Sequence, residues 1–584
     1  MTILILIGFC FLLSSCQNLS ASIESDDVQF PPTPTRTPFQ PLPEGIQPHA
    51  VFTLESSSKK TQTPQFRPYP GPDDDEIIFP ELASSPSVWV DPAIPPEIID
   101  QFSLPIAWTI THDPDTAELS IEVNHDDPIS RWVYALTAPF PTVPDEVTFD
   151  DLIRCWAGED TGPFAGNPLL IDEDTLNAFS VLWGTPSPQA VRVIPAAEML
   201  DEAWGTRPSW ALIPFSALEP RWKVLDVNGL SPVHKNFDPA AYPLSIPVSL
   251  LSKAGDSEML LHTYGTETIA TILPHSNWNP EKMTTLAMTG VTALVRATAN
   301  TMEVKGITYP AQDIGELLRN ADLTHISNEV PFARDCPLPN PVQIGVSFCS
   351  DTRYIELLEN VGTDIIELTG DHFGDWGVEA MNYTLELYEE RGWTVYGGGY
   401  NLAEGKKPVT LERNGNRFAF IGCNRKGSQF AGASAEFPGA VVCDFPYMHA
   451  EITRLRDEGY LVIATFQHFE YYTYYALPDQ VEDFQSMAEA GAFIVSGSQA
   501  HHPQAMEFNY GAFIHYGLGN LFFDQYDVSL GARQGFIDIH IFYDGRHIST
   551  ELVTIIFVDY ARPRIMTPDE RAQVLGSVFS ASGW

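Results

Sequence analysis

The sequence predicts an α/β protein whose larger, C-terminal region has a mixed sheet arrangement covered by helices. Two observations lead to this prediction. Between about residues 283 and 560, short apolar runs typical of buried strands alternate with segments whose apolar residues recur at helical spacing. Near the end of this region, Asp544 and Gly545 separate two strand-like runs, which is the signature of a β-hairpin.

The predicted elements follow one another in a regular order along this region. Ser350 is expected to cap a helix through residues 354–361, which Gly362 ends. Pro478 is expected to open a later helix, which Gly491 ends. In chain order, the other expected strands are residues 323–326, 365–368, 393–396, 418–421, 461–466, 493–495, 513–515, 536–543 and 547–558, and the other expected helices are residues 380–388 and 448–455.

A smaller region, residues 87–251, also combines strands and helices. Three of its segments, residues 138–142, 150–158 and 213–229, resemble parts of one lobe of a type 2 periplasmic binding protein. The resemblance implies a small α/β domain that binds a ligand, or one that only docks or spaces, because no motif within it carries chemistry. Its expected strands are residues 105–110, 132–136, 210–214 and 223–227, and its expected helix is residues 174–183.

Length and charge limit the classes of function. A chain of 584 residues with 44% hydrophobic content is long and apolar enough for two or three folded domains. It contains 76 acidic but only 32 basic residues, a formal net charge of −44. This balance argues against binding to nucleic acid, or to anionic lipid, through a general electrostatic patch. An anionic ligand would need bridging cations or a local basic patch, for which Arg425 and Lys426 are the candidates.

The beginning of the chain predicts export to the outer face of the cell membrane. The apolar run at residues 3–13 is too short to span a bilayer comfortably and leads into the sequence LSSC, which ends at Cys16. This tetrapeptide resembles a bacterial lipobox, which implies a signal peptide over residues 1–16 and lipidation of Cys16. No Lys or Arg precedes the run, so an uncleaved anchor, a simple secretory signal and a different start codon stay open.

Two segments are expected to lie outside the folded domains. Residues 17–86 are rich in proline, carry an acidic run at residues 73–76 and offer little apolar surface to bury, so they are expected to form an extended linker. At the other end, residues 561–584 are expected to form a C-terminal tail after a main domain at residues 283–560.

The cysteines favour an oxidising compartment. Seven cysteines, less Cys10 in the signal peptide and the lipidated Cys16, leave five. Four of these flank two loops rich in proline, or in glycine and alanine, which favours local disulfides and leaves Cys155 as a buried thiol. No cysteine spacing matches a zinc motif. The expected disulfides are Cys336–Cys349 and Cys423–Cys443.

Polar side chains follow several of the predicted strands. In the most prominent case, the strand at residues 365–368 runs into a loop with Asp371, His372 and Asp375. In α/β proteins, ligand-binding groups collect at the carboxyl ends of strands, and Asp and His side chains can bind metals or transfer protons. The same residue types also populate ordinary turns and caps. The other such segments are residues 327–329, 467–471, 497–504 and 516–524.

These segments resemble motifs of the CapA family of capsule synthesis proteins, over about residues 283–558. The resemblance implies a metallophosphatase-like four-layer α/β/β/α sandwich, preceded here by the smaller α/β domain. It also implies a role with capsules of poly-γ-glutamate. The matching positions are Asn328 and Glu329, Asp371 and His372 with Asp375 and Gly377, Glu470 and Tyr471, residues 497–504, and residues 517–524.

The sequence departs from the family pattern at positions that would bind metal. Gly290 and Val291 stand where the family has Gly-Asp, residues 466–468 where it has His-Trp-Gly, and Gln499 where it has the first His of His-Pro-His. A two-metal centre needs several ligands around ions about 3.5–4 Å apart. With these ligands lost, the remaining residues are expected to hold one divalent ion, Mn²⁺ or Mg²⁺, or none. His468 is a candidate replacement for a lost histidine. It lies two residues from the family position, which is about 7 Å along a strand.

Two hypotheses of different class follow. In the first, the protein is an exported CapA-family lipoprotein that acts on an anionic cell-surface polymer, together with the capsule machinery, by hydrolysis or transfer at an amide or phosphoester. In the second, it is a non-catalytic module that binds a polymer or partner through a degenerate cleft. The residues expected to act in catalysis are Asp371, His372 and Glu470, and the expected metal ligands are Glu329, Asp371, His372, Gln499 and His501.

Overall fold

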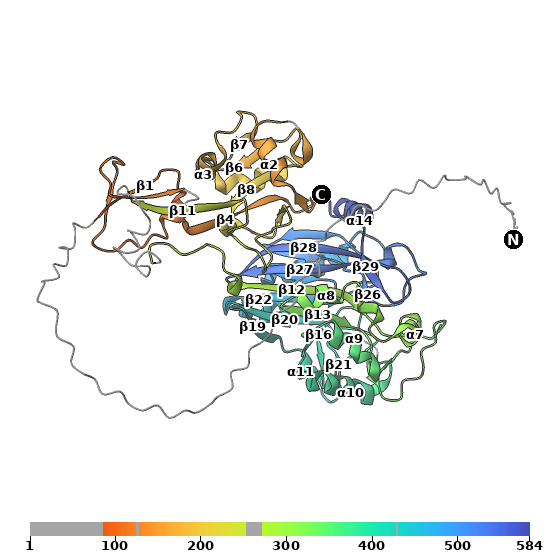
Figure 1. The fold of residues 1–584 in the computed structure, drawn as a ribbon. Helices are drawn as coiled ribbons and strands as arrows, with labels where there is room; N and C mark the ends of the chain where they lie inside the picture. Colours follow the sequence, from red (N-terminus) through yellow and green to blue (C-terminus); the bar gives the residue numbers. More distant parts are fainter. Residues whose placement is uncertain (1–85, 124–127, 160, 253–270, 428–429) are drawn as a thin grey trace, which may run out of the picture. The chain divides into compact units, whose positions relative to one another are not determined.

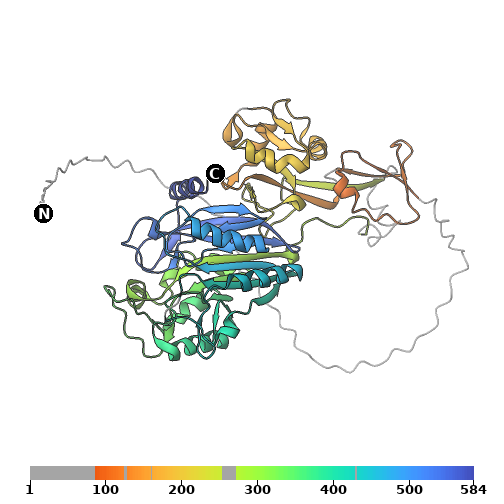
Figure 2. The same ribbon diagram turned by 180° about the vertical axis from the view of Figure 1, so that it is seen from behind.

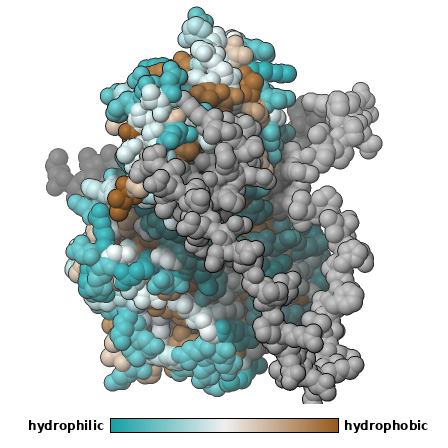
Figure 3. Space-filling view, turned by 60° about the vertical axis from the view of Figure 1, so that its left-hand side comes forward, coloured by the Kyte–Doolittle hydropathy of each residue, from teal (hydrophilic) through white to brown (hydrophobic). Residues whose placement is uncertain are grey.

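A computed structural model describes residues 86–584, apart from residues 124–127, 160, 253–270 and 428–429 (Figure 1). The predicted signal peptide, the lipobox at Cys16 and nearly all of the linker therefore lie outside the described residues. Within the described part, none of the helices combines the length and apolar character needed to cross a membrane. On the face shown in Figure 3, hydrophilic side chains cover much of the described surface, in keeping with the high net charge.

The larger domain is built around two large sheets, the first of which is mixed (Figure 1). In spatial order, its strands are β17 (Thr394–Tyr396), β16 (Ile365–Glu367), β13 (Leu323–Asn328), β12 (Met283–Thr292), β27 (Gln534–Tyr543), β28 (Arg546–Phe557) and β29 (Pro563–Ile565), with β26 (Asn520–Phe522) against β12. The strands from β17 to β12 are parallel, and β27 and β28 form an antiparallel hairpin. Asp544 and Gly545 connect this hairpin with φ angles of 50° and 77°, which confirms the predicted turn.

The second sheet has a parallel centre. In spatial order, its strands are β19 (Val409–Arg413), β20 (Asn416–Asn424), β22 (Leu461–Gln467), β23 (Ile494–Ser496), β25 (Ala512–His515) and β24 (Met506–Asn509). The pairs from β20 to β25 are parallel, so the carboxyl ends of these strands lie along one edge of the sheet.

The two sheets pack face to face and enclose a hydrophobic core. Leu286 of β12 and Leu323 of β13 belong to the same buried cluster as Phe420 of β20 and Ile463 of β22. Side chains alternate between the faces of a strand, so each sheet turns one apolar row inward. The row that faces the other way is covered by helices.

Helices complete the four-layer α/β/β/α sandwich that the sequence predicts (Figures 1 and 2). On the second sheet, Ile452 and Phe484 of two helices pack against strand residues such as Ala464. Four other helices, among them α7 (Arg296–Lys305), lie along the chain between the parallel strands of the first sheet. The helices are α12 (Phe445–Asp457) and α13 (Pro478–Ala490) on the second sheet, and, besides α7, α8 (Gly315–Asn320), α9 (Ile355–Asn360) and α10 (Gly377–Glu390) on the first.

The smaller domain is α/β, and its strand β4 is long enough to pair at both of its ends with different neighbours. Of the expected strand at residues 105–110, only the end is extended, because Pro105 begins a turn closed by Trp108 N–H. The strands in spatial order are β2 (Thr109–Thr111), β1 (Ser87–Val90), β3 (Leu119–Val123), β11 (Ser245–Ser252), β4 (Pro128–Pro139), β8 (Trp210–Pro214), β6 (Leu169–Ile171) and β7 (Val191–Val193), with β9 (Trp222–Val224) against β4; the helices are α2 (Phe149–Trp156), α3 (Glu173–Trp183) and α4 (Met199–Gly205).

Residues 561–584, expected to be a tail, form β29 and the helix α14 (Pro568–Ala581). Buried Phe579 of α14 lies near Phe140 of the smaller domain, with ring centroids 6.5 Å apart. Arg571 of the same helix pairs with Asp145 of the smaller domain at 2.7 Å. The helix therefore contacts the smaller domain through both apolar and charged side chains.

The covalent and capping predictions have mixed outcomes. Both expected disulfides are present, and Cys155 is a free, buried thiol. Ser350 does not cap a helix, which corrects the expectation: it lies in the short strand β15 (Ser350–Asp351), and its hydroxyl donates to the carbonyl of Leu294. The carboxylate of Asp351 accepts from Arg353 N–H instead, and caps a 3₁₀ turn that leads into α9.

Candidate metal centre

Five of the side chains singled out at strand ends converge at one edge of the sandwich. Glu329 follows β13, Asp371 and His372 follow β16, Glu470 follows β22, and His501 follows β23. Their ligand atoms form two groups, each within 4.8 Å: Glu329 with Glu470 and His501, and Glu329 with Asp371 and His372. Because the two sheets lie face to face, loops from both meet around the shared Glu329.

Glu329 is the most deeply buried member, at 1% exposed. Burial raises the pKa of its carboxyl group, and the nearby positive charges of His501 and His372 oppose the shift. A buried carboxylate is costly unless a cation or hydrogen bonds compensate it. Its position between two sets of ligand atoms therefore suits a bound cation.

His501 is held with one ring nitrogen available. Its Nδ1 lies 2.9 Å from Asn520 Oδ1, and Asn520 Nδ2 donates to the carbonyl of Ala532 at 3.0 Å. This amide orientation makes Asn520 Oδ1 the acceptor, so the proton of His501 sits on Nδ1. In the neutral form of His501 the Nε2 atom, 3.9 Å from Glu470, carries no proton and can coordinate, as in most metal-binding histidines.

His372 belongs to the other group and is oriented by Asp375. Its Nδ1 lies 2.7 Å from Asp375 Oδ2, and that oxygen also accepts a hydrogen bond from Phe348 N–H at 2.9 Å. Burial alone would lower the pKa of His372, but the hydrogen bond to Asp375 and the charge of Glu329 outweigh it and raise the pKa to about 9. His372 therefore holds a second proton at neutral pH in the absence of a metal.

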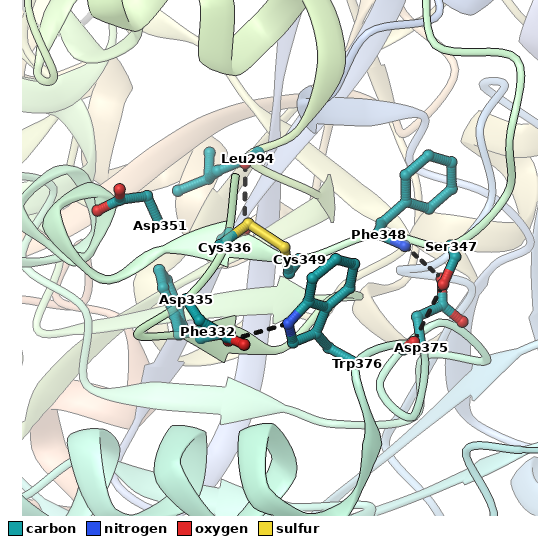
Figure 4. Close-up of a disulfide and its surroundings, with 12 residues drawn as sticks. Leu294, Phe332, Asp335, Cys336, Ser347, Phe348, Cys349, Asp351, Asp375 and Trp376 are labelled. Carbon is teal, nitrogen blue, oxygen red and sulfur yellow. Dashed lines mark hydrogen bonds between the residues drawn. A yellow bond between two sulfur atoms is a disulfide. The ribbon is translucent and has the colours of Figure 1, made fainter. Parts of the chain in front are cut away.

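The loop that supplies Phe348 is closed by the disulfide Cys336–Cys349, as Figure 4 shows. Ser347 Oγ donates to the carbonyl of Asp375 at 3.0 Å, next to the bond from Phe348 N–H. The disulfide thus lies beside the two residues that fix Asp375, and through Asp375 it helps to orient His372.

Lys426 lies between two of the carboxylates. Its Nζ is 2.8 Å from Asp371 Oδ2 and also pairs with Glu470. Burial would raise the pKa of Asp371 and of Glu470, but Lys426 at the first, and His501 with Lys426 at the second, lower both pKa values instead. Both carboxylates are therefore kept ionised. Gln467 Nε2 donates to Asp371 Oδ1 at 2.6 Å and fixes that carboxylate from the other side.

Two other residues considered from the sequence have different partners. Gln499 Nε2 donates to Ser327 Oγ at 2.6 Å, while its buried Oε1 accepts no hydrogen bond from the described residues. His468 Nε2 lies 3.0 Å from Asp483 of α13, so it does not replace the missing histidine. The reason is that β22 ends at Gln467, and it is Gln467, one residue earlier, that contacts Asp371 and Glu329.

This donor set fits a divalent ion. Carboxylate oxygens with an imidazole nitrogen are ligands that Mn²⁺ accepts, and Mg²⁺ also prefers carboxylates. Two buried amide oxygens, Gln499 Oε1 and Asn328 Oδ1, lack hydrogen-bond partners among the described residues, and Asn328 directly precedes Glu329. Glu329, Glu470 and His501 would hold the ion, because His501 has a free nitrogen and His372 carries its second proton.

Sequence reasoning gave three residues of this centre no role in it, although Gln467 and Asn520 lie within the segments singled out after strands. Lys426 follows β20 by two residues, Gln467 is the last residue of β22, and Asn520 is the first residue of β26. The sequence suggests Lys426 only as part of a basic patch with Arg425, but Lys426 pairs with Asp371 and Arg425 with Asp483. The rule that ligands follow strands, applied to the expected strand at residues 418–421, would have singled out Lys426.

Taken together, the sandwich and its centre define a metallophosphatase-like α/β protein. Residues 285–525 match a family model described as "Bacterial capsule synthesis protein PGA_cap". The matched region contains all five converging side chains. Residues 285–525 thus form a domain of this family, in agreement with the CapA motifs in the sequence.

Curated relatives point to the same family. The chain is 24% identical over 265 residues to the "Capsule biosynthesis protein CapA" of Bacillus anthracis, covering 44% of this chain and 64% of the relative. It is 25% identical over 172 residues to the "PGA biosynthesis protein CapA" of Bacillus subtilis (strain 168), covering 29% and 45%. The chain thus spans less than two thirds of the length of either relative.

Solved structures with partial similarity include a sulfate thiohydrolase SoxB from Thermus thermophilus, with a TM-score of 0.26, 11% identity, and coverage of 44% of this chain and 42% of the other. Another is an ABC-type phosphate transport receptor from Vibrio cholerae, with a TM-score of 0.22, 14% identity, and coverage of 27% and 74%.

Proposed function

We propose that this CapA-family protein is an exported lipoprotein, anchored through Cys16 on the outer face of the cell membrane, that acts in the synthesis, attachment or export of a capsule polymer such as poly-γ-glutamate. The lipobox-like sequence supports the anchor, and the names of the two relatives support a role with capsules. The polymer and the capsule machinery are the proposed partners.

The proposed reaction is metal-assisted hydrolysis or transfer at an amide or phosphoester bond. The observation that carries it is the convergence of two ligand groups on one buried carboxylate, Glu329. A divalent ion held by Glu329, Glu470 and His501 would polarise the scissile group and lower the pKa of a bound water. The protein contributes the remaining parts of the mechanism.

His372 is the proposed general acid. With a pKa of about 9 it carries a proton at neutral pH, which it can donate to the leaving group. Asp375 accepts the hydrogen bond from Nδ1 and so fixes the ring, leaving Nε2 as the atom that transfers the proton. Asp371, fixed by Lys426 and Gln467, lies on the same side of the centre and orients the substrate.

The first test is metal content. The chain from residue 86 to 584, purified without a tag, is expected to contain about one divalent ion per molecule by mass spectrometry, and His501→Ala is expected to lose it. The matched control is His449→Ala, because His449 only contacts Ser486 on the helices of the second sheet. Wild-type protein that binds no added Mn²⁺ or Mg²⁺ would leave the non-catalytic binding module as the better hypothesis.

The second test is polymer binding. Arg425 and Lys426 are both paired with carboxylates, so they offer no uncompensated charge to a polyanion. With a net charge of −44, the protein is therefore expected to bind poly-γ-glutamate only with a divalent cation present. Sedimentation of the protein with the polymer, with and without a chelator, measures this. Binding that the chelator leaves unchanged would contradict cation bridging.

A further inference from the structure

Lys426 connects the two candidate ligand groups. The groups share Glu329, and their remaining carboxylates are Glu470 in one and Asp371 in the other. The Lys426 ammonium contacts both of these carboxylates, with 2.8 Å between Nζ and Asp371 Oδ2. A positive charge of the protein itself therefore bridges one ligand from each group.

The position of Lys426 is fixed by its surroundings rather than by chance rotation of a surface side chain. It follows the end of β20, where Asn424 Oδ1 accepts a hydrogen bond from Gly427 N–H at 2.8 Å. Arg425 N–H donates to the carbonyl of Gln467 at 2.8 Å, which ties the same segment to the end of β22. The Lys426 side chain is 27% exposed, so most of it is enclosed.

The charges in the centre suit one divalent ion and one ammonium. Glu329, Asp371 and Glu470 together carry three negative charges when ionised, and Lys426 neutralises one of them, while protonated His372 pairs with Asp375. One divalent ion neutralises the other two. A second divalent ion would lie about 3.5–4 Å from the first, as in two-metal sites. It would need Asp371, the carboxylate of the second group that Lys426 already contacts.

We infer that the ammonium group of Lys426 occupies the position of a second metal ion, so that the centre holds one divalent ion and a built-in cation. This inference rests on the proposed metal binding. It also gives Lys426 a role. Its fixed positive charge beside the single ion would stabilise negative charge that develops on the substrate, as the second ion does in a two-metal centre.

The inference is tested by titrating metal-free protein with Mn²⁺, with calorimetry for stoichiometry and electron paramagnetic resonance for the state of the ions. Wild type is expected to bind one Mn²⁺ with the spectrum of isolated ions. Lys426→Ala is expected to bind a second Mn²⁺ and to show the spectrum of an exchange-coupled pair. Lys426→Arg, which keeps the charge, is expected to bind one.

Lys282→Ala is the matched control, because Lys282 forms an exposed ion pair with Asp544, outside both ligand groups, and its loss is expected to leave one ion bound. Two ions in the wild type, or one in Lys426→Ala, would overturn the inference while leaving metal binding intact. A folded Lys426→Ala, by circular dichroism, that binds no metal would also overturn it. Wild type that binds no ion would instead contradict the proposed function.

Discussion

Two histidines of the larger domain lie near buried glutamates, yet their pKa values move in opposite directions. His372, at the candidate metal centre, has its pKa raised to about 9, whereas His325, between the two sheets, has its pKa lowered to about 3. His325 Nε2 lies 3.6 Å from Glu367 Oε2 and 2.8 Å from the hydroxyl of Tyr396. Both regions thus contain His and Glu side chains at close range.

The difference lies in the charges around each histidine. Burial lowers the pKa of both, but at the metal centre Asp375 outweighs burial. Between the sheets, burial raises the pKa of Glu367, which accepts hydrogen bonds from Thr369 and Ser498. A carboxyl group with a raised pKa offers His325 less negative charge to pair with. A histidine beside a glutamate is therefore not sufficient for a metal centre, because the charges must persist and the ligand atoms must converge.

The largest expected effect comes from disrupting the buried layer, meaning the polar side chains that lie between the two sheets. Asp538 Oδ2 lies 2.6 Å from His515 Nδ1, and both residues are at most 1% exposed. Asp538→Ala leaves the imidazole without its partner, and breaking a buried pair of this kind costs about 3–5 kcal/mol. Urea unfolding measures the loss, with the exposed Asp527→Ala as control. A stability loss below about 1 kcal/mol would show that this layer adds little to the fold.

The pH dependence of stability separates the two histidines. His325 has a lowered pKa, so below pH 6.5 the unfolded chain binds a proton at this histidine that the native state does not bind. Stability is therefore lost as pH falls from 6.5 towards 3. His372 has a raised pKa, so its contribution is present below pH 6.5 and is lost as pH rises through about 9.

Unfolding curves measured across this pH range give the free energy of unfolding as a function of pH, which has an acidic and an alkaline limb. Along each limb, one titrating group changes this free energy by at most about 1.4 kcal/mol per pH unit. His325→Gln is expected to reduce only the acidic limb, and His372→Gln only the alkaline one. A variant that altered the opposite limb would contradict the assignment.

A smaller effect is expected from a residue that orients a ligand at the metal centre. Asn520→Ala removes the acceptor for His501 Nδ1, and losses of this kind typically weaken metal binding by about 10–100-fold. Calorimetric titration with Mn²⁺ measures the change. Asn509→Ala is the control, since Asn509 only contacts Glu507 on the second sheet. Unchanged affinity would mean that Asn520 does not set the ring of His501.

The smallest effect on stability is expected from replacing a glutamate by glutamine between the two sheets, whereas the same replacement at the metal centre is expected to abolish metal binding. Glu367→Gln replaces a carboxyl whose raised pKa favours the neutral form by an amide of similar shape, so it is expected to change stability by less than about 1 kcal/mol. Glu329→Gln, at the metal centre, removes the shared ligand and is expected to abolish metal binding. Equal effects of the two substitutions would erase the distinction between the regions.

The order of strands and helices was predictable because each element carries its own local pattern. Pro478 and Gly491 bound α13 as expected, and strand residues such as Ile365 and Ile463 are buried where the apolar runs predict. The strand-end rule also found Glu329 and His501. These predictions need only neighbouring residues in the sequence.

What could not be predicted depends on contacts across the two sheets. Lys426 and Asp371 come from different sheets, and no pattern along the chain states that they meet. The same holds for Glu367 and Ser498, whose contact joins the two sheets within the buried layer. His468 was a candidate replacement for the lost histidine, but it follows the end of β22 at Gln467 and its side chain contacts Asp483 of a neighbouring helix instead.

The order of the cysteines has a consequence for biogenesis. Each disulfide joins cysteines that are consecutive in the chain, 13 and 20 residues apart. Cys155 precedes all four, so an oxidant that paired thiols strictly in order of emergence would join Cys155 to Cys336 and shift every later partner by one. Burial of Cys155 in the smaller domain, whose strands are complete by Ser252, would prevent this error if that domain folds first. Prior folding of the smaller domain would therefore favour correct oxidation of the larger one.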